Sequence, residues 1–290
     1  MRQFLLAILT CLSFATLSAQ LYLGVATSAM ATWQTDNLDF TQTQPGGGAT
    51  LGGVIQYNIR HFYLRSGVSL EYFNAIQKIS NTDFNIPMQD AEGISFIYRG
   101  EIQNRRDNVR FLEISIPLIL GAQLQHFYFG GGIRAVFPTL SRAQQKAQYM
   151  TLGDYEGRYY EDLSDMPQHG FYDYRSITTG NTLSLQPDIR ICFETGAIVN
   201  TKIGRNKYSD ILKIGLYAEY GLLNTIKNNG NLELNQIDLS PFPMPTINNV
   251  YTTTQAGAFS VHNIMLGLHI AWLFPISNTA RHSHNKCMCF

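Results

Sequence analysis

Nine charged side chains lie in segments that are otherwise apolar, and their types and spacing make them the first candidates for chemistry. They are Arg65, Glu71, Glu113, Arg134, Asp188, Arg190, Glu194, Lys213 and Glu219. Both signs are present in nearly equal number, so these side chains could pair with one another. A charge buried without a partner loses several kcal/mol of solvation. The composition of the set therefore predicts ion pairs.

The stretch FLEISIPLIL, residues 111–120, shows how such a charge is positioned. Every second residue from Leu112 to Leu124 is apolar, whereas Glu113, Ser115 and Pro117 lie between them. A period of two is that of a β-strand, because a helix would mix the two sets around its circumference. One face of this strand is therefore apolar and must be covered by protein or by lipid.

Eight segments have this period. They cover residues 21–34, 49–59, 62–80, 109–124, 127–139, 186–203, 211–226 and 259–276. Short connections alternate with long polar ones over residues 35–48, 81–108, 140–185 and 227–258. This plan predicts an all-β fold, an eight-stranded antiparallel transmembrane β-barrel with short periplasmic turns and long extracellular loops. A soluble barrel such as a lipocalin could share the strand count, but its apolar faces would not need to point outward.

The alternation places the nine charges on the inner face of the barrel. Eight strands enclose a space only wide enough for side chains to fill. We therefore expect a plugged lumen, with Arg134 near mid-height among Glu113, Glu194 and Glu219. Two alternatives are isolated charges wetted by lumenal water and a pore lined by these residues; the narrow bore argues against the pore.

Composition and the N-terminus indicate where the chain works. Charged residues make up 14% and the formal net charge is zero, whereas a soluble protein carries about a quarter charged residues. A chain with this charge balance offers no strongly basic surface to which nucleic acid could bind. Residues 1–19 have a cationic start, a short apolar run and a small-residue cleavage site, which predicts a signal peptide. We expect export to the bacterial outer membrane, with lipid and the barrel-insertion machinery as partners.

The expected division of the chain is a signal peptide over 1–19, the barrel over 20–276 and a periplasmic tail over 277–290. The tail contains His282, His284, Cys287 and Cys289. These are ligand types that a transition metal accepts, but their spacing matches no standard zinc motif. Neither a metal nor another cofactor is predicted.

The connection over 140–185 is the best candidate for a recognition surface. Its recognition candidates are Tyr155, Tyr159, Tyr160, Phe171, Tyr172 and Tyr174, which lie among acidic residues. Aromatic side chains with polar neighbours make contact surfaces at low entropic cost. The alternative interpretation is a lid that packs over the barrel, and the clustered acids could also offer oxygen ligands to Ca²⁺.

Catalytic patterns are scarce. Ser260 and His262 share parity on one segment, but no acid lies near them in the sequence to complete a hydrolase site. Phosphate-binding loops, nucleophile elbows and metalloprotease motifs are absent from the sequence. We therefore do not expect an enzyme. The alternative is a lipid-modifying barrel enzyme, which would carry a cluster of His, Ser and an acid on the outer wall.

Residues 111–118 resemble a strand that recurs in an outer-membrane β-barrel family common in Bacteroidetes, read roughly as Tyr-Leu-Glu-Ile-Pro-Leu-Leu-Leu. Phe111 to Ile114 match it, and so do Ile116, Pro117 and Leu118. The spacing at Ser115 and the residue after it departs from it, because Glu113 and Pro117 are further apart than in the family strand. The family includes PorT-like proteins of the type IX secretion system. The resemblance implies a barrel fold and an outer-membrane location. It also implies an alternative role, as an accessory of such a secretion system with partners at the loops or turns, beside the structural or recognitional role of the loops.

Overall fold

A computed structural model describes most of the chain. The described residues are 19–36, 41–90, 93–155, 158–159, 171–183, 185–201, 210–225, 237–238, 246–247 and 260–276. The predicted tail over 277–290 and all but the last residue of the predicted signal peptide lie outside them. Within these ranges, no helix has the length and apolarity needed to cross a membrane.

The described chain consists of β-strands joined by turns. The strands are β1 (Ala19–Asp36), β2 (Thr41–Gln44), β3 (Gly46–Ile59), β4 (Phe62–Ile79), β5 (Thr82–Gln89), β6 (Ser95–Gln123), β7 (Phe127–Tyr155), β8 (Arg158–Tyr159), β9 (Tyr172–Thr182), β10 (Asp188–Thr201), β11 (Asp210–Gly221), β12 (Ile237–Asp238), β13 (Thr246–Ile247) and β14 (Val261–Pro275).

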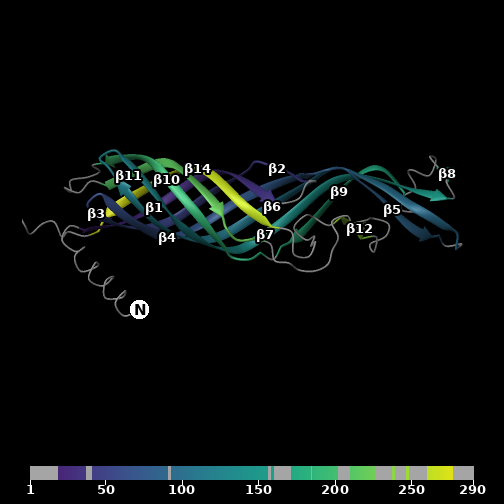
Figure 1. The fold of residues 1–290 in the computed structure, drawn as a ribbon, viewed down its shortest axis with the longest axis horizontal. Helices are drawn as coiled ribbons and strands as arrows, with labels where there is room; N and C mark the ends of the chain where they lie inside the picture. The colour runs from purple at the N-terminus through teal and green to yellow at the C-terminus, as the bar shows by residue number, and fades with distance from the viewer. Residues whose placement is uncertain are drawn as a thin grey trace, which may run out of the picture.

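Eight of these strands close into a ring by antiparallel pairing (Figure 1). The order is β1, β3, β4, β6, β7, β10, β11 and β14, and β14 pairs back with β1. Closure satisfies the backbone N–H and C=O groups around the ring, so the barrel wall has no free edge. The prediction of an all-β, eight-stranded antiparallel barrel is thus confirmed, and each predicted segment overlaps one strand of the ring.

Two of the predicted loops prove to be largely strand. Residues 81–108 contain β5 and the first part of β6, and residues 140–185 contain the second part of β7 together with β8 and β9. β6 and β7 have 29 residues each. They continue beyond the ring, where β5 pairs with β6 and β9 pairs with β7. We call this extension the arm: β5, residues 95–110 of β6, residues 142–155 of β7, and β9 (Figure 1).

Two β-bulges explain why the alternating pattern did not predict the arm. Leu112 pairs with Leu140 and Glu113 with Pro138, so Thr139 is an additional residue that reverses the parity of β7. A second register shift lies between Gln103 and Arg106 of β6. Asn104, within it, has a left-handed φ of 51°. In an antiparallel pair, the backbone hydrogen bonds continue on both sides of such an insertion. The residues that follow it, however, point to the opposite face from the one that the alternation predicts.

In the ring, apolar side chains face outward and polar side chains face the lumen. On the outer face Phe193 is 64% exposed, Leu216 59% and Leu268 60%. The inner face carries the polar residues, among them Gln56, which is fully buried. This is the reverse of a water-soluble barrel and is the arrangement of a barrel surrounded by hydrocarbon.

A charge on this outer face gives a direct test. We expect Leu216→Arg to lower the free energy of unfolding by about 2–4 kcal/mol, because a guanidinium at mid-height would be placed in hydrocarbon. The measurement is urea titration of the protein folded into phospholipid vesicles. The control is Ile97→Arg on the arm, for which a change within about 0.5 kcal/mol is expected. Equal effects of the two substitutions would mean that the outer face of the ring lies in water.

Candidate functional site

All nine charges predicted to face the lumen do so. Eight are buried, and the side chain of Arg134 is 12% exposed. They come from β4, β6, β7, β10 and β11, where alternation turns every second residue inward. The structure arranges them in two clusters, an upper cluster nearer the arm and a lower cluster nearer the short turn at residues 60–61.

Arg190 is at the centre of the upper cluster. Its Nη1 lies 2.8 Å from Oε2 of Glu71, its Nη2 forms an ion pair with Glu113, and its Nε lies 3.4 Å from Oδ2 of Asp188. The side chain has no measurable exposure to solvent. One guanidinium therefore satisfies carboxylates from three strands, which matches its planar set of five donors.

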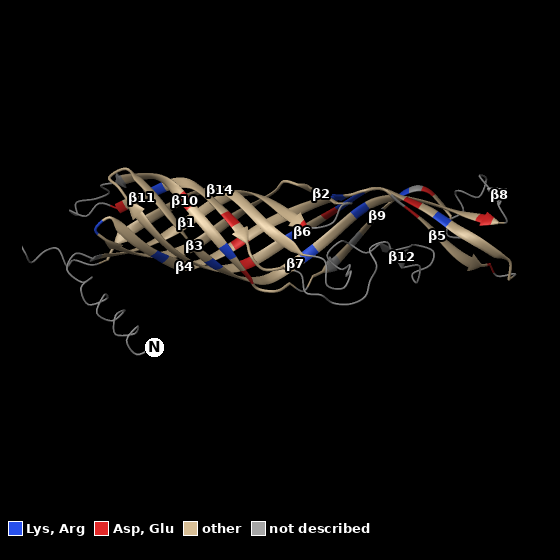
Figure 2. Cartoon of the chain, viewed as in Figure 1, with Lys and Arg blue, Asp and Glu red and all other residues tan. Residues whose placement is uncertain are grey.

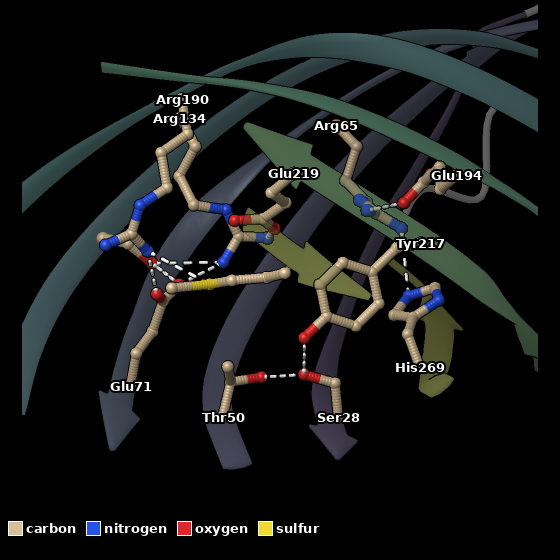
Figure 3. Close-up of polar contacts among 12 residues, drawn as sticks. Ser28, Thr50, Arg65, Glu71, Arg134, Arg190, Glu194, Tyr217, Glu219 and His269 are labelled. Carbon is tan, nitrogen blue, oxygen red and sulfur yellow. Dashed lines mark hydrogen bonds and ion pairs between the residues drawn. The ribbon is translucent and has the colours of Figure 1, made fainter. Parts of the chain in front are cut away.

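Arg134 completes the upper cluster from the neighbouring strand, directly opposite Arg190 in the pairing of β7 with β10. It forms an ion pair with Glu71, and its Nη2 lies 3.0 Å from Oε1 of Glu219 (Figure 3). Ser115 also donates a hydrogen bond to Glu71. Glu71 thus joins the two arginines, whose like charges would otherwise face each other across adjacent strands.

The lower cluster is built around a second ion pair, between Arg65 and Glu194. The Tyr63 hydroxyl donates a hydrogen bond of 2.8 Å to Oε1 of Glu194. His269 lies with Nε2 at 3.3 Å from Arg65 and Nδ1 at 3.1 Å from the hydroxyl of Tyr128. Figure 3 shows Arg65 between Glu194 and His269.

Glycines make room for this cluster. A Cβ atom added at Gly121 would lie 2.4 Å from the ring of Tyr63, and one added at Gly130 would lie 2.4 Å from its hydroxyl oxygen. Both distances are far below van der Waals contact. The Tyr63 ring can therefore reach Glu194 only because β6 and β7 carry glycine at these positions.

Lys213 is held differently from the arginines. Its Nζ donates a hydrogen bond of 2.9 Å to Oε1 of Gln56. The same atom lies 3.7 Å from the ring centroid of Tyr63 and 4.8 Å from that of Tyr128. The ammonium is fully buried, so an amide oxygen and two aromatic faces replace its hydration shell.

Two apolar clusters pack among the charges inside the ring. The lower apolar cluster contains Tyr22, Val54, Tyr63, Ile119, Tyr128, Cys192, Ile198, Ile211 and Leu273. The upper apolar cluster contains Met30, Phe73, Ala75, Ile79, Val109, Phe111, Ala143, Leu183, Tyr217, Val261 and Met265. A cavity of about 40 Å³ has a lining that includes Ser28, Thr50, Arg134, Glu219 and His269. A cavity of this size holds no more than a few water molecules.

The predicted grouping around Arg134 is only partly correct. Arg134 contacts Glu219 as expected, but its other partner is Glu71. Glu113 pairs with Arg190, and Glu194 pairs with Arg65. Alternation reveals which face a residue takes, but the partner across the lumen depends on strand register and tilt, which the sequence pattern does not give.

Sequence reasoning also missed the neutral members of the network. Tyr63, Tyr128 and His269 contact its charges, as do Ser115 and Gln56. Each has the inward parity of its strand. Alternation could therefore have identified them had polar and aromatic residues been read together with the charges.

The residues considered for hydrolysis do not assemble a catalytic group within the described structure. His262 stacks on Tyr220, with ring centroids 5.9 Å apart, and its Nδ1 lies 3.1 Å from the backbone oxygen of Gly221. No carboxylate of the described residues is hydrogen-bonded to it. Among those residues there is also no group of three His, Cys, Asp or Glu side chains able to hold a metal ion, and the tail with its histidines and cysteines lies outside them.

The aromatic recognition candidates occupy a different setting from the one expected. Phe171 and Tyr172 are 5% and 1% exposed. Tyr155 is half-buried and stacks on Phe96 with ring centroids 4.8 Å apart. These three rings pack within the arm because their segment pairs as strand, which corrects the expectation of an exposed loop surface. Tyr160 and the side chains of Tyr159 and Tyr174 lie outside the described part of the structure.

The packed rings give the arm a small core of its own. Tyr149 and Tyr172 meet edge to face with ring centroids 5.4 Å apart, beside Ile102 and Ala147. Burial, with smaller contributions from Tyr172 and Tyr98, raises the pKa of Tyr149 to about 12. Its hydroxyl therefore remains protonated at physiological pH.

Comparisons with known proteins add little. No family model matches the sequence, and no curated protein matches it. Among solved structures, the chain is similar to Ail, the attachment invasion locus protein of Yersinia pestis, solved with the heparin analogue sucrose octasulfate. The identity is 8% and the TM-score 0.30, over 87% of this chain and 99% of that one. Neisserial surface protein A matches with 12% identity and a TM-score of 0.29, over 89% and 99%. Likenesses this distant say nothing of function.

The ion pairs can be tested by removing their central cation. We expect Arg190→Met to lower the free energy of unfolding by about 3–5 kcal/mol, because Glu71, Glu113 and Asp188 would lose their shared buried partner. Glu113→Gln should cost less, since the amide oxygen still accepts from Arg190. Arg60→Met, at an exposed site in the turn after β3, is the control, and all variants are compared by urea titration in vesicles. If Arg190→Met is as stable as the control, lumenal water solvates these charges.

Proposed function

We propose that the chain is an outer-membrane β-barrel with a closed lumen, which acts as a structural anchor for the arm it presents outside the cell. The observation that carries this proposal is the set of buried, ion-paired charges packed among apolar side chains inside a ring with an apolar outer surface. Such a ring suits a bilayer on the outside. The side chains that fill its lumen suit a plug rather than a channel.

Transport is disfavoured by energetics. Opening a path would require separating Arg190 from Glu71, Glu113 and Asp188, and each uncompensated charge costs several kcal/mol. The lower cluster adds Arg65 and Glu194 to the same barrier. The narrow bore of eight strands leaves no room for a parallel route around them.

A recognitional role is supported by the arm. β6 and β7 pass from the ring into it, and its aromatic rings are packed against one another. A preformed arm of this kind presents a surface without the entropic loss of ordering a loop. We propose that extracellular or secretion-system proteins bind this surface.

Two other roles rank lower. The accessory role in a PorT-like secretion system rests on the resemblance of residues 111–118, and deletion of the protein would have to reduce the secretion of cargo. A lipid-modifying enzyme would need a catalytic group on the outer wall. The contacts of His262 with Gly221 and Tyr220 offer no such group, so we propose a non-enzymatic role.

Closure of the lumen has an electrical signature. Purified protein folded in detergent should migrate differently on gels before and after boiling, which reports a folded barrel. In planar bilayers we expect no steady conductance, because the ion-paired layer blocks the lumen. A stable conductance from heat-modifiable protein would contradict the plug but not the barrel.

Orientation is tested by cysteine labelling in intact cells. In a background lacking Cys287 and Cys289, we expect Thr178→Cys on the exposed face of β9 to react with a membrane-impermeant maleimide. The control is His61→Cys in the short turn between β3 and β4, which should react only after the membrane is opened. The reverse pattern would place the arm in the periplasm. Cys192 is buried in the lumen and should stay unlabelled.

A further inference from the structure

Five basic side chains gather on the outer face of the sheet where β4, β6 and β7 leave the ring. Arg110 pairs with Arg142 across β6 and β7. Four residues further from the ring, Arg106 pairs with Lys146 on one side and with Lys78 on the other. All five are exposed. We call them the basic patch, and Figure 2 shows basic segments along β6 and β7 beyond the ring.

The basic patch has no acidic counterpart among the described residues. No carboxylate of those residues forms an ion pair with any of its five members. Between its two rows lie only Ile76, Asn108 and Gln144 on these three strands. Like charges placed directly opposite each other across strands destabilise a sheet. The arrangement is thus unfavourable unless an anion binds to it.

A concave site lies at the arginine row. A cavity of about 660 Å³ is lined by both Arg110 and Arg142, and on the side toward the ring by Tyr72, Leu112 and Leu140. Tyr72 is 51% exposed and Leu140 45%. The cavity therefore has a cationic part formed by two guanidinium groups and an apolar part formed by neighbouring side chains of the same three strands.

The apolar part of the cavity is continuous with the outer surface of the ring. Leu70, Ile114 and Phe137 form the next exposed row below Tyr72, Leu112 and Leu140. The arginine row thus follows directly after the last apolar row. In a membrane barrel, side chains at this position lie at the level of the lipid headgroups, where guanidinium groups meet phosphates.

We propose that the basic patch binds the phosphorylated headgroup of a lipid in the outer leaflet, with Arg110 and Arg142 on a phosphate and the acyl chains against Tyr72, Leu112 and Leu140. Charge complementarity and continuity with the apolar surface carry this inference. Arg106, Lys146 and Lys78 extend the site toward further phosphates of the same headgroup region. The inference rests on the outer-membrane location proposed above.

The test uses the full mature chain folded in a neutral detergent, with lipid binding followed by native mass spectrometry. The probes are lipid A carrying two phosphates and the same lipid with its phosphates removed. We expect the phosphorylated lipid to be retained at least about tenfold better. Arg110→Gln and Arg142→Gln should each reduce its retention by roughly tenfold, since each removes one charge-assisted contact. Arg60→Gln, an exposed arginine in the turn at the opposite end of the ring, is the matched control and should bind as the unaltered chain does.

Several outcomes would overturn the proposal. These are equal retention of the two lipids, unchanged binding by the Arg110→Gln, Arg142→Gln double variant, or full displacement of lipid A by excess inorganic phosphate. Binding of a sulfated oligosaccharide in place of lipid A would assign the patch to a soluble polyanion instead. A heat-modifiable band is checked for every variant. If the unaltered chain gives no heat-modifiable band, the proposed barrel is wrong. If it gives the band but does not bind the lipid, only the proposed lipid site is wrong.

Discussion

The contact of the Arg190 guanidinium with carboxylates of β4, β6 and β10 is the interaction on which the rest of the lumen depends. The ring encloses too little space to hydrate a charge, so every inward-facing ion needs a partner within reach. This requirement selects arginine, which can donate to several acceptors in fixed directions. It also ties β4, β6 and β10 together across the lumen, so that the register of each strand is fixed by contacts in the centre as well as by its neighbours.

The same requirement explains which small residues appear on the inner face. Arg65 and Glu194 pair beside the ring of Tyr63, and that ring fits because Gly121 and Gly130 have no side chains. Lys213 is placed against the same ring. The lower cluster therefore packs as one unit of aromatic, glycine and charged residues. A substitution at any one of these positions changes the space available to the others.

Alternation alone predicted the strands of the ring, their order of short and long connections, and the inward direction of all nine charges. It worked because each strand of the ring separates hydrocarbon from polar atoms, which leaves a clear period in the sequence. It failed beyond the ring for two physical reasons. From Arg105 to Arg110 both faces of β6 carry polar residues, so no period is visible. At Thr139 an additional residue reverses the parity of β7. The partners within each cluster stayed beyond prediction because they depend on distances across the lumen.

β6 and β7 run without interruption from the barrel wall to the far end of the arm. From Arg110 to Ser95, β6 covers sixteen residues, or roughly 50 Å along the strand at about 3.3 Å per residue. The pairing of β6 with β7 resumes on both sides of the bulge at Asn104, so the arm joins the barrel wall through a hydrogen-bonded ladder and not through a linker. A force applied at the tip of the arm is therefore transmitted along this ladder to the barrel as torque.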